Sequence, residues 1–189
     1  MNIGLYFGSF NPVHIGHLIL ANHVANNSPV EQVWFMVSPQ NPLKPANSLL
    51  NEYQRLHLVR LAVGDDPQLK ASDAEFHLPR PSYTTDTLAY LEEKYPQHRF
   101  YLILGSDSFT NIQRWKNASL LLERYPFLVY KRPGFEITTT WDADLTIMDA
   151  PLLQISATAI REAVHAGKSI RYLVPDAVRE EIERGHYYK

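Results

Sequence analysis

Residues 3–17 read IGLYFGSFNPVHIGH, and this stretch decides the class of fold. The apolar run Ile3–Phe7 ends in a turn containing glycine, asparagine and proline, which predicts a buried strand that closes abruptly. Apolar residues at helical spacing follow over residues 18–25. A strand, a glycine turn and a helix in this order predict an anion site, because free N–H groups and the helix dipole meet there.

Strand-like and helix-like segments alternate along the rest of the chain. Buried strands are expected over residues 32–38, 69–76, 99–104, 127–130 and 145–148. Helices are expected over residues 51–63, 86–95, 156–165 and 176–184, with a broken helix over residues 107–124. This alternation predicts an α/β fold with a doubly wound parallel sheet. The length of 189 residues predicts one domain over residues 1–189.

The charge and the composition exclude several classes of protein. The 18 Lys and Arg against 20 Asp and Glu give a formal net charge of −2, which argues against nucleic acid or an anionic membrane as a partner. The lack of cysteine excludes a disulfide framework, a thiolate zinc site and a cysteine nucleophile. No apolar run approaches the roughly 18 residues that span a bilayer, and no signal-peptide pattern opens the chain, so we expect a cytoplasmic protein.

His14 and His17 stand three residues apart at the start of the first helix and so share one face. Gly16 between them is expected to leave room for a ligand near the backbone. Two imidazoles on this face can donate hydrogen bonds to phosphate oxygens and stabilise the charge of a leaving group. The alternatives are two ordinary polar residues or a metal pair. No clear third ligand follows in the sequence, so we expect no metal site.

Residues 155–161, ISATAIR, form a second cluster at a helix start. Ser156 stands where an N-cap belongs, and Thr158 falls in the first turn. Arg161 can clamp a phosphate with its planar guanidinium group. The alternative is a capped surface helix with a solvated arginine.

Two loops add further candidates. Lys44 stands between Pro42 and Pro45, which restrict the loop and suit a lysine that reaches a fixed phosphate. Residues 82–87, SYTTDT, bring hydroxyls and backbone donors to another helix start, with Thr85 as the expected cap. This second segment suits a bound carboxylate or simply caps its helix.

Three candidates follow later strands. Asp107 comes after the strong strand that ends at Gly105, where a ribose or a metal would lie, although it can also be a helix cap. Trp115 can stack on a flat ring or belong to the core. Arg132 is a weaker candidate for binding phosphate.

The sequence resembles a known enzyme superfamily in two signatures. Residues 8–17 and 155–161 resemble the motifs of the nucleotidyltransferases that share an HxGH sequence. Residues 42–44, residues 82–88 and the Gly-Ser-Asp of residues 105–107, with the tryptophan that follows, resemble the bacterial nicotinate-nucleotide adenylyltransferases within that superfamily. The segments occur in family order and cover most of the chain.

Two positions depart from the family pattern. Leu43 stands where the family often has histidine, so any phosphate contact from that histidine is absent or supplied elsewhere. Asn11 stands where aspartate is common, and asparagine still supports a turn.

The resemblance implies a Rossmann-like sheet with a small helical C-terminal part over about residues 156–189. It implies adenylyl transfer from ATP to nicotinate mononucleotide, with Mg²⁺, giving nicotinate adenine dinucleotide and pyrophosphate in NAD biosynthesis. The phosphate of the mononucleotide attacks in line, and no covalent enzyme intermediate forms. The two substrates are then the partners, and a homo-oligomer is possible.

The resemblance also implies roles for residues at the matching positions. The residues expected to act in catalysis are His14, His17, Lys44 and Arg161. The residues expected to bind ATP are Gly8, Ser9, Phe10, His17, Gly105, Asp107, Ile155, Ser156, Thr158 and Arg161. The residues expected to bind the mononucleotide are Lys44, Tyr83, Thr84, Thr85, Trp115 and Arg132.

Other functions are weighed against this one. Phosphopantetheine adenylyltransferase shares both signatures, but residues 82–87 argue against it. Cytidylyltransferases are more distant. Class I aminoacyl-tRNA synthetases share the His-Ile-Gly-His sequence, but this chain is too short and lacks a Lys-Met-Ser-Lys-Ser segment. A non-catalytic nucleotide sensor on the same fold would bind ATP without releasing pyrophosphate.

Overall fold

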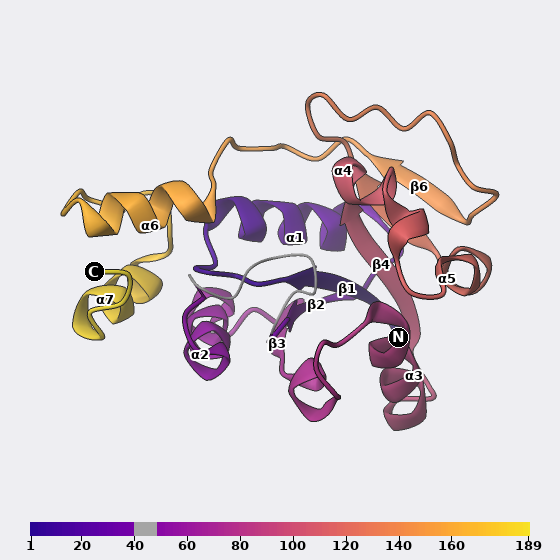
Figure 1. Cartoon of the computed structure of the whole chain (residues 1–189), viewed down its shortest axis with the longest axis horizontal. Helices are drawn as coiled ribbons and strands as arrows, with labels where there is room; N and C mark the ends of the chain where they lie inside the picture. Colours follow the sequence, from indigo (N-terminus) through magenta and orange to yellow (C-terminus); the bar gives the residue numbers. More distant parts are fainter. Residues whose placement is uncertain (40–48) are drawn as a thin grey trace.

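The computed structural model describes residues 1–39 and 49–189. Within them, six strands form one parallel sheet in the order β3-β2-β1-β4-β5-β6 (Figure 1). The strands are β1 Asn2–Gly8, β2 Gln32–Val37, β3 Leu69–Ser72, β4 Arg99–Gly105, β5 Phe127–Tyr130 and β6 Leu145–Met148. This order is that of a doubly wound dinucleotide-binding sheet, and it confirms the predicted class of fold.

Helices connect the strands and follow the last one. They are α1 Ile15–Asn27, α2 Glu52–Val63, η2 Ala74–His77, α3 Thr84–Lys94, α4 Ser106–Phe109, η3 Ile112–Arg114, α5 Ala118–Arg124, α6 Ala157–His165 and α7 Asp176–Arg184. The broken helix predicted over residues 107–124 is therefore α4, η3 and α5 in succession. Two helices after the sheet confirm the helical C-terminal part.

Two predictions of local structure were wrong. The strand expected over residues 69–76 ends at Ser72, because the Ser72 hydroxyl accepts the Ala74 N–H at 3.3 Å and the chain turns into η2. Helix α3 begins at Thr84 with Tyr83 as its N-cap, so Thr85 is not the cap.

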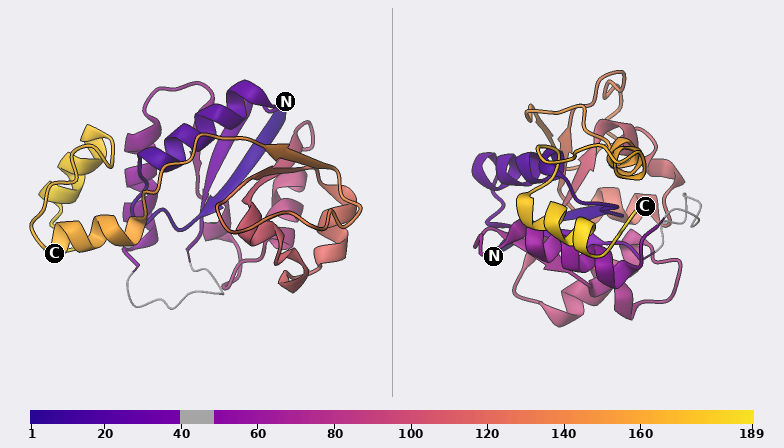
Figure 2. Two further views of the ribbon diagram at one scale, coloured as in Figure 1. Left: turned by 90° about the horizontal axis from the view of Figure 1, so that it is seen from above. Right: turned by 90° about the vertical axis from the view of Figure 1, so that its left-hand side faces the viewer.

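Side chains alternate along the strands between two hydrophobic clusters. On β2, Val33, Phe35 and Val37 face the cluster that contains α1 and α2, whereas Trp34 and Met36 face the cluster of α3, α4 and α5. The C-terminal helices join the first cluster through Ile160, Ile170, Val174, Val178 and Ile182. This packing places α6 and α7 beside the carboxyl end of the sheet (Figure 2).

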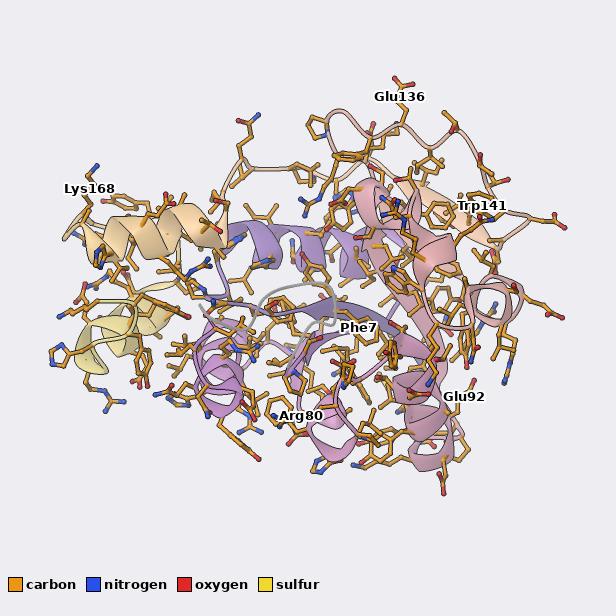
Figure 3. All side chains as sticks on the ribbon, in the orientation of Figure 1. Phe7, Arg80, Glu92, Glu136, Trp141 and Lys168 are labelled. Atoms are coloured by element: carbon orange, nitrogen blue, oxygen red, sulfur yellow. The ribbon has the colours of Figure 1, made fainter. Side chains whose placement is uncertain are left out.

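The strand order reverses between β1 and β4, and ligands of doubly wound sheets bind at such a switch point. At the carboxyl end of β1, Tyr6 faces the first cluster and Phe7 packs against the second. Phe7 lies near the centre of the fold, whereas Glu136 and Lys168 lie at its periphery (Figure 3). The fold thus offers two surfaces, one on each side of Gly8.

The fully buried Arg55 of α2 connects the loops at this end of the sheet. Its Nη1 donates to the carbonyl oxygens of Ser9 at 2.6 Å and Ser38 at 2.8 Å. Its Nε donates to Leu50 at 2.8 Å, and its Nη2 donates to Pro39 at 3.0 Å. One guanidinium group thus satisfies four carbonyls from the β1–α1 turn, the end of β2 and the start of α2.

We expect Arg55→Met to lower the free energy of unfolding by at least about 3 kcal/mol, because four buried carbonyls lose their donor. The melting temperature should fall by about 6–12 °C for a chain of this size. Arg60→Met, at an exposed position of the same helix, is the matched control and should stay close to the parent. Equal melting temperatures for the two variants would contradict this account of Arg55.

Candidate active site

The two histidines of the first signature stack at the N-terminus of α1. Their ring centroids lie 3.6 Å apart with an angle of 20° between the planes. Nδ1 of His17 accepts the backbone N–H of His14 at 3.2 Å, so the proton of a neutral His17 ring is on Nε2. Phe10 packs edge-on against His17 at 5.1 Å and restricts the ring further. His17 is therefore held as an oriented hydrogen-bond donor.

Gly16 lies close to the ring of His14. A Cβ atom at this position would lie 3.1 Å from Nδ1 of His14, within 4 Å of Ile155. A side chain at this position would therefore crowd the His14 ring, and the room that Gly16 leaves for a ligand stays a prediction. The same contact shows that the second signature lies against the first.

Burial and, to a smaller extent, the nearby Arg132 guanidinium together lower the pKa of His14 to about 4. Burial also lowers the pKa of His17 well below its usual value, with contributions from His14 and Arg132. Both imidazoles are therefore neutral near pH 7. They offer N–H donors without fixed charge until an anion arrives.

This pKa makes stability depend on pH in a defined window. The unfolded chain protonates His14 near pH 6.5 and the folded chain only near pH 4, so stability is complete above pH 6.5 and is lost as the pH falls. The protonation of His14 alone should lower the free energy of unfolding by about 2 kcal/mol between pH 7 and pH 5. We expect the melting temperature of the parent to fall about 4–8 °C more over this interval than that of His14→Gln. His165→Gln, at an exposed position of α6, should behave as the parent.

The second signature begins α6 as predicted. Ser156 is the N-cap, and its hydroxyl accepts the Ala159 N–H at 3.0 Å. Arg161 donates from Nη2 to the Thr158 hydroxyl at 3.2 Å and from Nη1 to the Asn11 carbonyl at 2.8 Å. Two motifs 150 residues apart are thus joined directly above the end of β1.

Arg132 lies on this side of the sheet. Its Nε pairs with Oδ1 of Asp107 at 3.4 Å, and its Nη2 donates to the Tyr130 hydroxyl at 3.2 Å. Its backbone N–H donates to the Ser106 hydroxyl at 2.8 Å. Gly105 gives these side chains their room, because a Cβ atom would displace the Asp107 carboxylate and lie 2.9 Å from Nε of Arg132.

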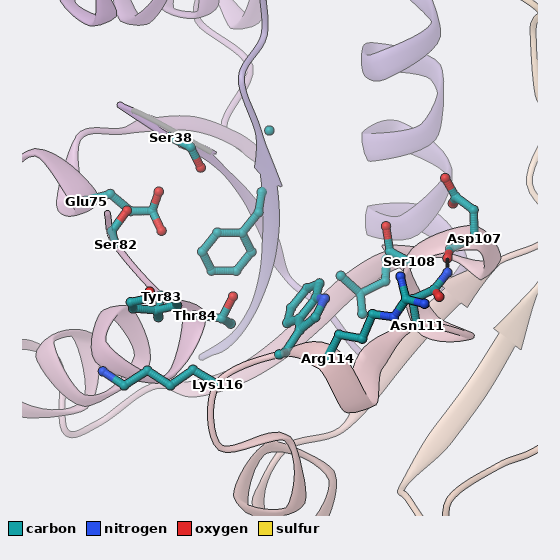
Figure 4. Close-up of a pocket in the computed structure, with 14 residues that line it drawn as sticks. Ser38, Glu75, Ser82, Tyr83, Thr84, Asp107, Ser108, Asn111, Arg114 and Lys116 are labelled. Carbon is teal, nitrogen blue, oxygen red and sulfur yellow. Dashed lines mark hydrogen bonds between the residues drawn. The ribbon is translucent and has the colours of Figure 1, made fainter. Parts of the chain in front are cut away.

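A cavity of about 670 Å³ opens on the other side of Gly8 (Figure 4). Its lining comes from the ends of β1, β2 and β4, from η2, from the start of α3, and from α4 and the segment between α4 and α5. The lining residues are Phe7, Gly8, Ser38, Glu75, Ser82, Tyr83, Thr84, Leu104, Asp107, Ser108, Asn111, Arg114, Trp115 and Lys116. A cavity of this size suits a small molecule with one flat ring and several polar groups.

The start of α3 presents backbone donors at this cavity. The first hydrogen bonds of the helix are donated by Asp86 and Thr87 to the Tyr83 carbonyl. The N–H groups of Thr84 and Thr85 precede these bonds, and of these two residues Thr84 lines the cavity. Lys116 adds a positive charge: its Nζ lies 2.9 Å from Asp86 and 4.8 Å from the centre of the Tyr83 ring. The arrangement favours a carboxylate at this end of the cavity.

Comparison with known proteins agrees with this geometry. The cytidylyltransferase-like family model matches residues 5–163. A probable nicotinate-nucleotide adenylyltransferase of Flavobacterium psychrophilum is 48% identical over 195 residues, covering 100% of both chains. One from Cytophaga hutchinsonii is 48% identical over 189 residues, covering 100% of this chain and 98% of the relative. The chain belongs to the nicotinate-nucleotide adenylyltransferase family.

A solved structure has the same fold at low sequence identity. It is the Plasmodium falciparum nicotinic acid mononucleotide adenylyltransferase complexed with NaAD, with a TM-score of 0.81 and 21% identity. The match covers 99% of this chain and 97% of that one. Rossmann-like architecture is therefore common to both.

Within this family fold, the expected residues fall into two groups. The histidine pair, Arg161 and Arg132 lie on the first side of Gly8, and Tyr83, Thr84 and Trp115 line the cavity on the other. Arg132, which was expected to contact the mononucleotide, is not among the lining residues. Thr85 does not line the cavity, and its buried hydroxyl has no partner among the described residues. Lys44 lies outside the residues that the structure describes.

Sequence reasoning missed several residues of the cavity. They are Ser38, Glu75, Ser108, Asn111, Arg114 and Lys116. Glu75 is 3% exposed, and its Oε1 accepts the Thr87 hydroxyl at 2.9 Å. Burial raises the pKa of this carboxyl, while the hydroxyls of Ser38, Thr87 and Ser82 act in the opposite direction. Glu75 thus connects the start of α3 to the end of β2, and it stands seven residues before Ser82 with no motif to mark it.

Residues 1–39 and 49–189 contain neither a metal-binding cluster nor a helix that could span a membrane. No group of three or more His, Asp or Glu side chains is arranged to hold a metal ion. None of the described helices has the length and apolar character needed to span a bilayer.

Proposed function

We propose that this chain transfers the adenylyl group of ATP to nicotinate mononucleotide, giving nicotinate adenine dinucleotide and pyrophosphate. The observation that carries the proposal is the pair of sites on either side of Gly8, at the switch point of the sheet. One side offers hydrogen-bond donors to phosphate oxygens from two helix starts. The other side is a cavity that suits a flat ring. A dinucleotide joined by two phosphates spans such a pair.

ATP belongs on the side of the two signatures. The triphosphate would lie between the starts of α1 and α6, where the N–H groups of Ser9 and Phe10 join Ser156 and Thr158. Arg161 and the histidine pair would complete the donors. We also assign Arg132 to this side, because it lies close enough to both histidines to lower their pKa. The other ATP contacts, from Gly8, Gly105, Asp107 and Ile155, remain as the resemblance implies.

Nicotinate mononucleotide belongs in the cavity. Trp115 would stack on the pyridine ring, and the start of α3, with Tyr83, Thr84 and Thr85, would bind its carboxylate. Lys44 would bind phosphate on the mononucleotide side. Phosphopantetheine has no flat ring or carboxylate to match this lining, which disfavours that family as the alternative.

The reaction then requires positioning and charge stabilisation. A phosphate oxygen of the mononucleotide attacks the α-phosphorus of ATP, and the bond to the bridging oxygen of pyrophosphate breaks. Negative charge grows on that leaving oxygen, where Nε2–H of His17 and the guanidinium of Arg161 are suited to stabilise it. The assigned residues include no activated nucleophile, in keeping with direct transfer.

Mg²⁺ enters this scheme with the nucleotide. The ion prefers phosphate oxygens and water, and ATP brings both. We further propose that residues 1–189 act as one domain, since α6 and α7 share a core cluster with the sheet. A cytoplasmic location and a homo-oligomer remain predictions.

The deciding experiment measures pyrophosphate release from ATP and Mg²⁺ with three acceptors offered separately. These are nicotinate mononucleotide, nicotinamide mononucleotide and phosphopantetheine. Release with nicotinate mononucleotide alone is the expected result. Release with phosphopantetheine would overturn the assignment of the cavity, and no release with any acceptor would favour a nucleotide sensor.

A further inference from the structure

The end of the chain returns to the first signature. After α7, residues 185–189 form a short C-terminal tail whose side chains contact α7 and the turn after β1. The Tyr188 hydroxyl donates to Oδ1 of Asn11 at 2.8 Å, joining residues 177 positions apart. Nothing in the sequence of this polar C-terminal segment indicates such a contact.

Asn11 is the point where several segments meet. Its Oδ1 also accepts the backbone N–H of Leu50 at 3.2 Å, and its own carbonyl accepts Arg161 at 2.8 Å. The residue is 5% exposed. Two donors on one side-chain oxygen fix the orientation of the carboxamide, and the backbone bond fixes the peptide beside it. Asn11 follows Phe10, whose φ of 47° is uncommon for a residue with a side chain.

The tail itself is held in an unfavourable backbone conformation. His186 has a φ of 53° and Tyr188 a φ of 63°, in the left-handed region that favours glycine. Specific contacts must therefore stabilise the tail in this position. The Tyr187 hydroxyl donates to Glu181 at 3.2 Å on α7, and the Tyr188 hydroxyl reaches the first signature. Burial raises the pKa of Tyr188, so its hydroxyl remains a donor across the neutral range.

We propose that Tyr188 is a positioning residue for adenylyl transfer, acting through Asn11 on the β1–α1 turn and on Arg161. This inference rests on the proposed function and extends it to the last residues of the chain. Without the hydroxyl, the side-chain oxygen of Asn11 loses a donor, and the turn that presents donors to the triphosphate loses a restraint. ATP binding should suffer, and the cavity for the mononucleotide should not.

The test compares Tyr188→Phe with Tyr187→Phe, since each variant removes one hydroxyl and keeps the ring. For Tyr188→Phe we expect kcat/KM for ATP to fall about tenfold, the equivalent of one hydrogen bond. The KM for nicotinate mononucleotide should change less than about twofold. Tyr187→Phe should match the parent in both constants. Equal kinetics for the two variants, whatever their melting temperatures, would overturn the proposal.

A double-mutant cycle decides whether the effect passes through Asn11. In the Asn11→Ala background, Tyr188→Phe should not lower kcat/KM for ATP any further. In the Asn11→Asp background, which keeps the acceptor oxygen, Tyr188→Phe should again lower kcat/KM for ATP about tenfold. Full additivity with Asn11→Ala would overturn the proposal. The dissociation constant of ATP with Mg²⁺, measured by calorimetry for each variant, gives the same comparison without turnover. An inactive parent would therefore refute the proposed function and still leave the role of Tyr188 decided.

Discussion

His17→Ala should lower kcat by about 10²–10³-fold while changing the KM for either substrate only a few fold. The reason is the fixed direction of the ring. Nδ1 is already occupied by the backbone N–H of His14, so Nε2–H is the group that can meet the leaving oxygen. Such a donor contributes most when the charge on that oxygen is greatest, which is in the transition state.

The neutral state of His17 strengthens this expectation. Burial keeps its pKa low in the free protein, so it binds the ground-state triphosphate as a neutral donor and not as a cation. Loss of the ring should therefore cost little affinity for ATP. His17→Gln, which retains a side-chain N–H, should lose less activity than His17→Ala. His23→Ala, on the same helix and bonded only to Asn27 in the described structure, is the control. A raised KM with unchanged kcat would instead make His17 a residue of ground-state binding.

The fold was predictable because apolar periodicity and strand–helix alternation report burial directly. Strands β5 and β6 begin and end where the apolar runs do. The prediction failed after β3, where the hydroxyl of Ser72 captures the N–H of Ala74 and ends the strand. Apolar spacing carries no information about such a local side-chain bond.

The candidate site was predictable only where its residues are close together in sequence. Helical spacing in the sequence was enough to identify the pair His14 and His17 and the pair Ser156 and Arg161. Lys116 acquires a role from Asp86, 30 positions away, and this contact exists only after α3 and η3 have packed on the same face of the sheet.

The kcat/KM for nicotinate mononucleotide should be up to about 10⁴-fold higher than that for nicotinamide mononucleotide. At the start of α3, the N–H groups of Thr84 and Thr85 precede the first helical hydrogen bonds and suit a carboxylate. The amide of nicotinamide would turn an NH₂ group toward these donors or leave one of them without a partner. Lys116 adds a smaller, solvent-screened preference for the anion, because its Nζ is already paired with Asp86.

The structure allows one of these donors to be removed almost alone. Thr84 is the first residue of α3, where proline is well tolerated, and Tyr83 before it has φ −114° and ψ 147°, which a following proline accepts. Thr84→Pro deletes the N–H and should reduce the preference for nicotinate by about 10-fold to 100-fold, from the loss of one hydrogen bond to a charged group. Thr84→Ala deletes only the hydroxyl and should keep the preference. If both variants kept it, the carboxylate would have to be recognised elsewhere in the cavity. If the parent used both mononucleotides equally, the assignment of these N–H groups to the carboxylate would be wrong.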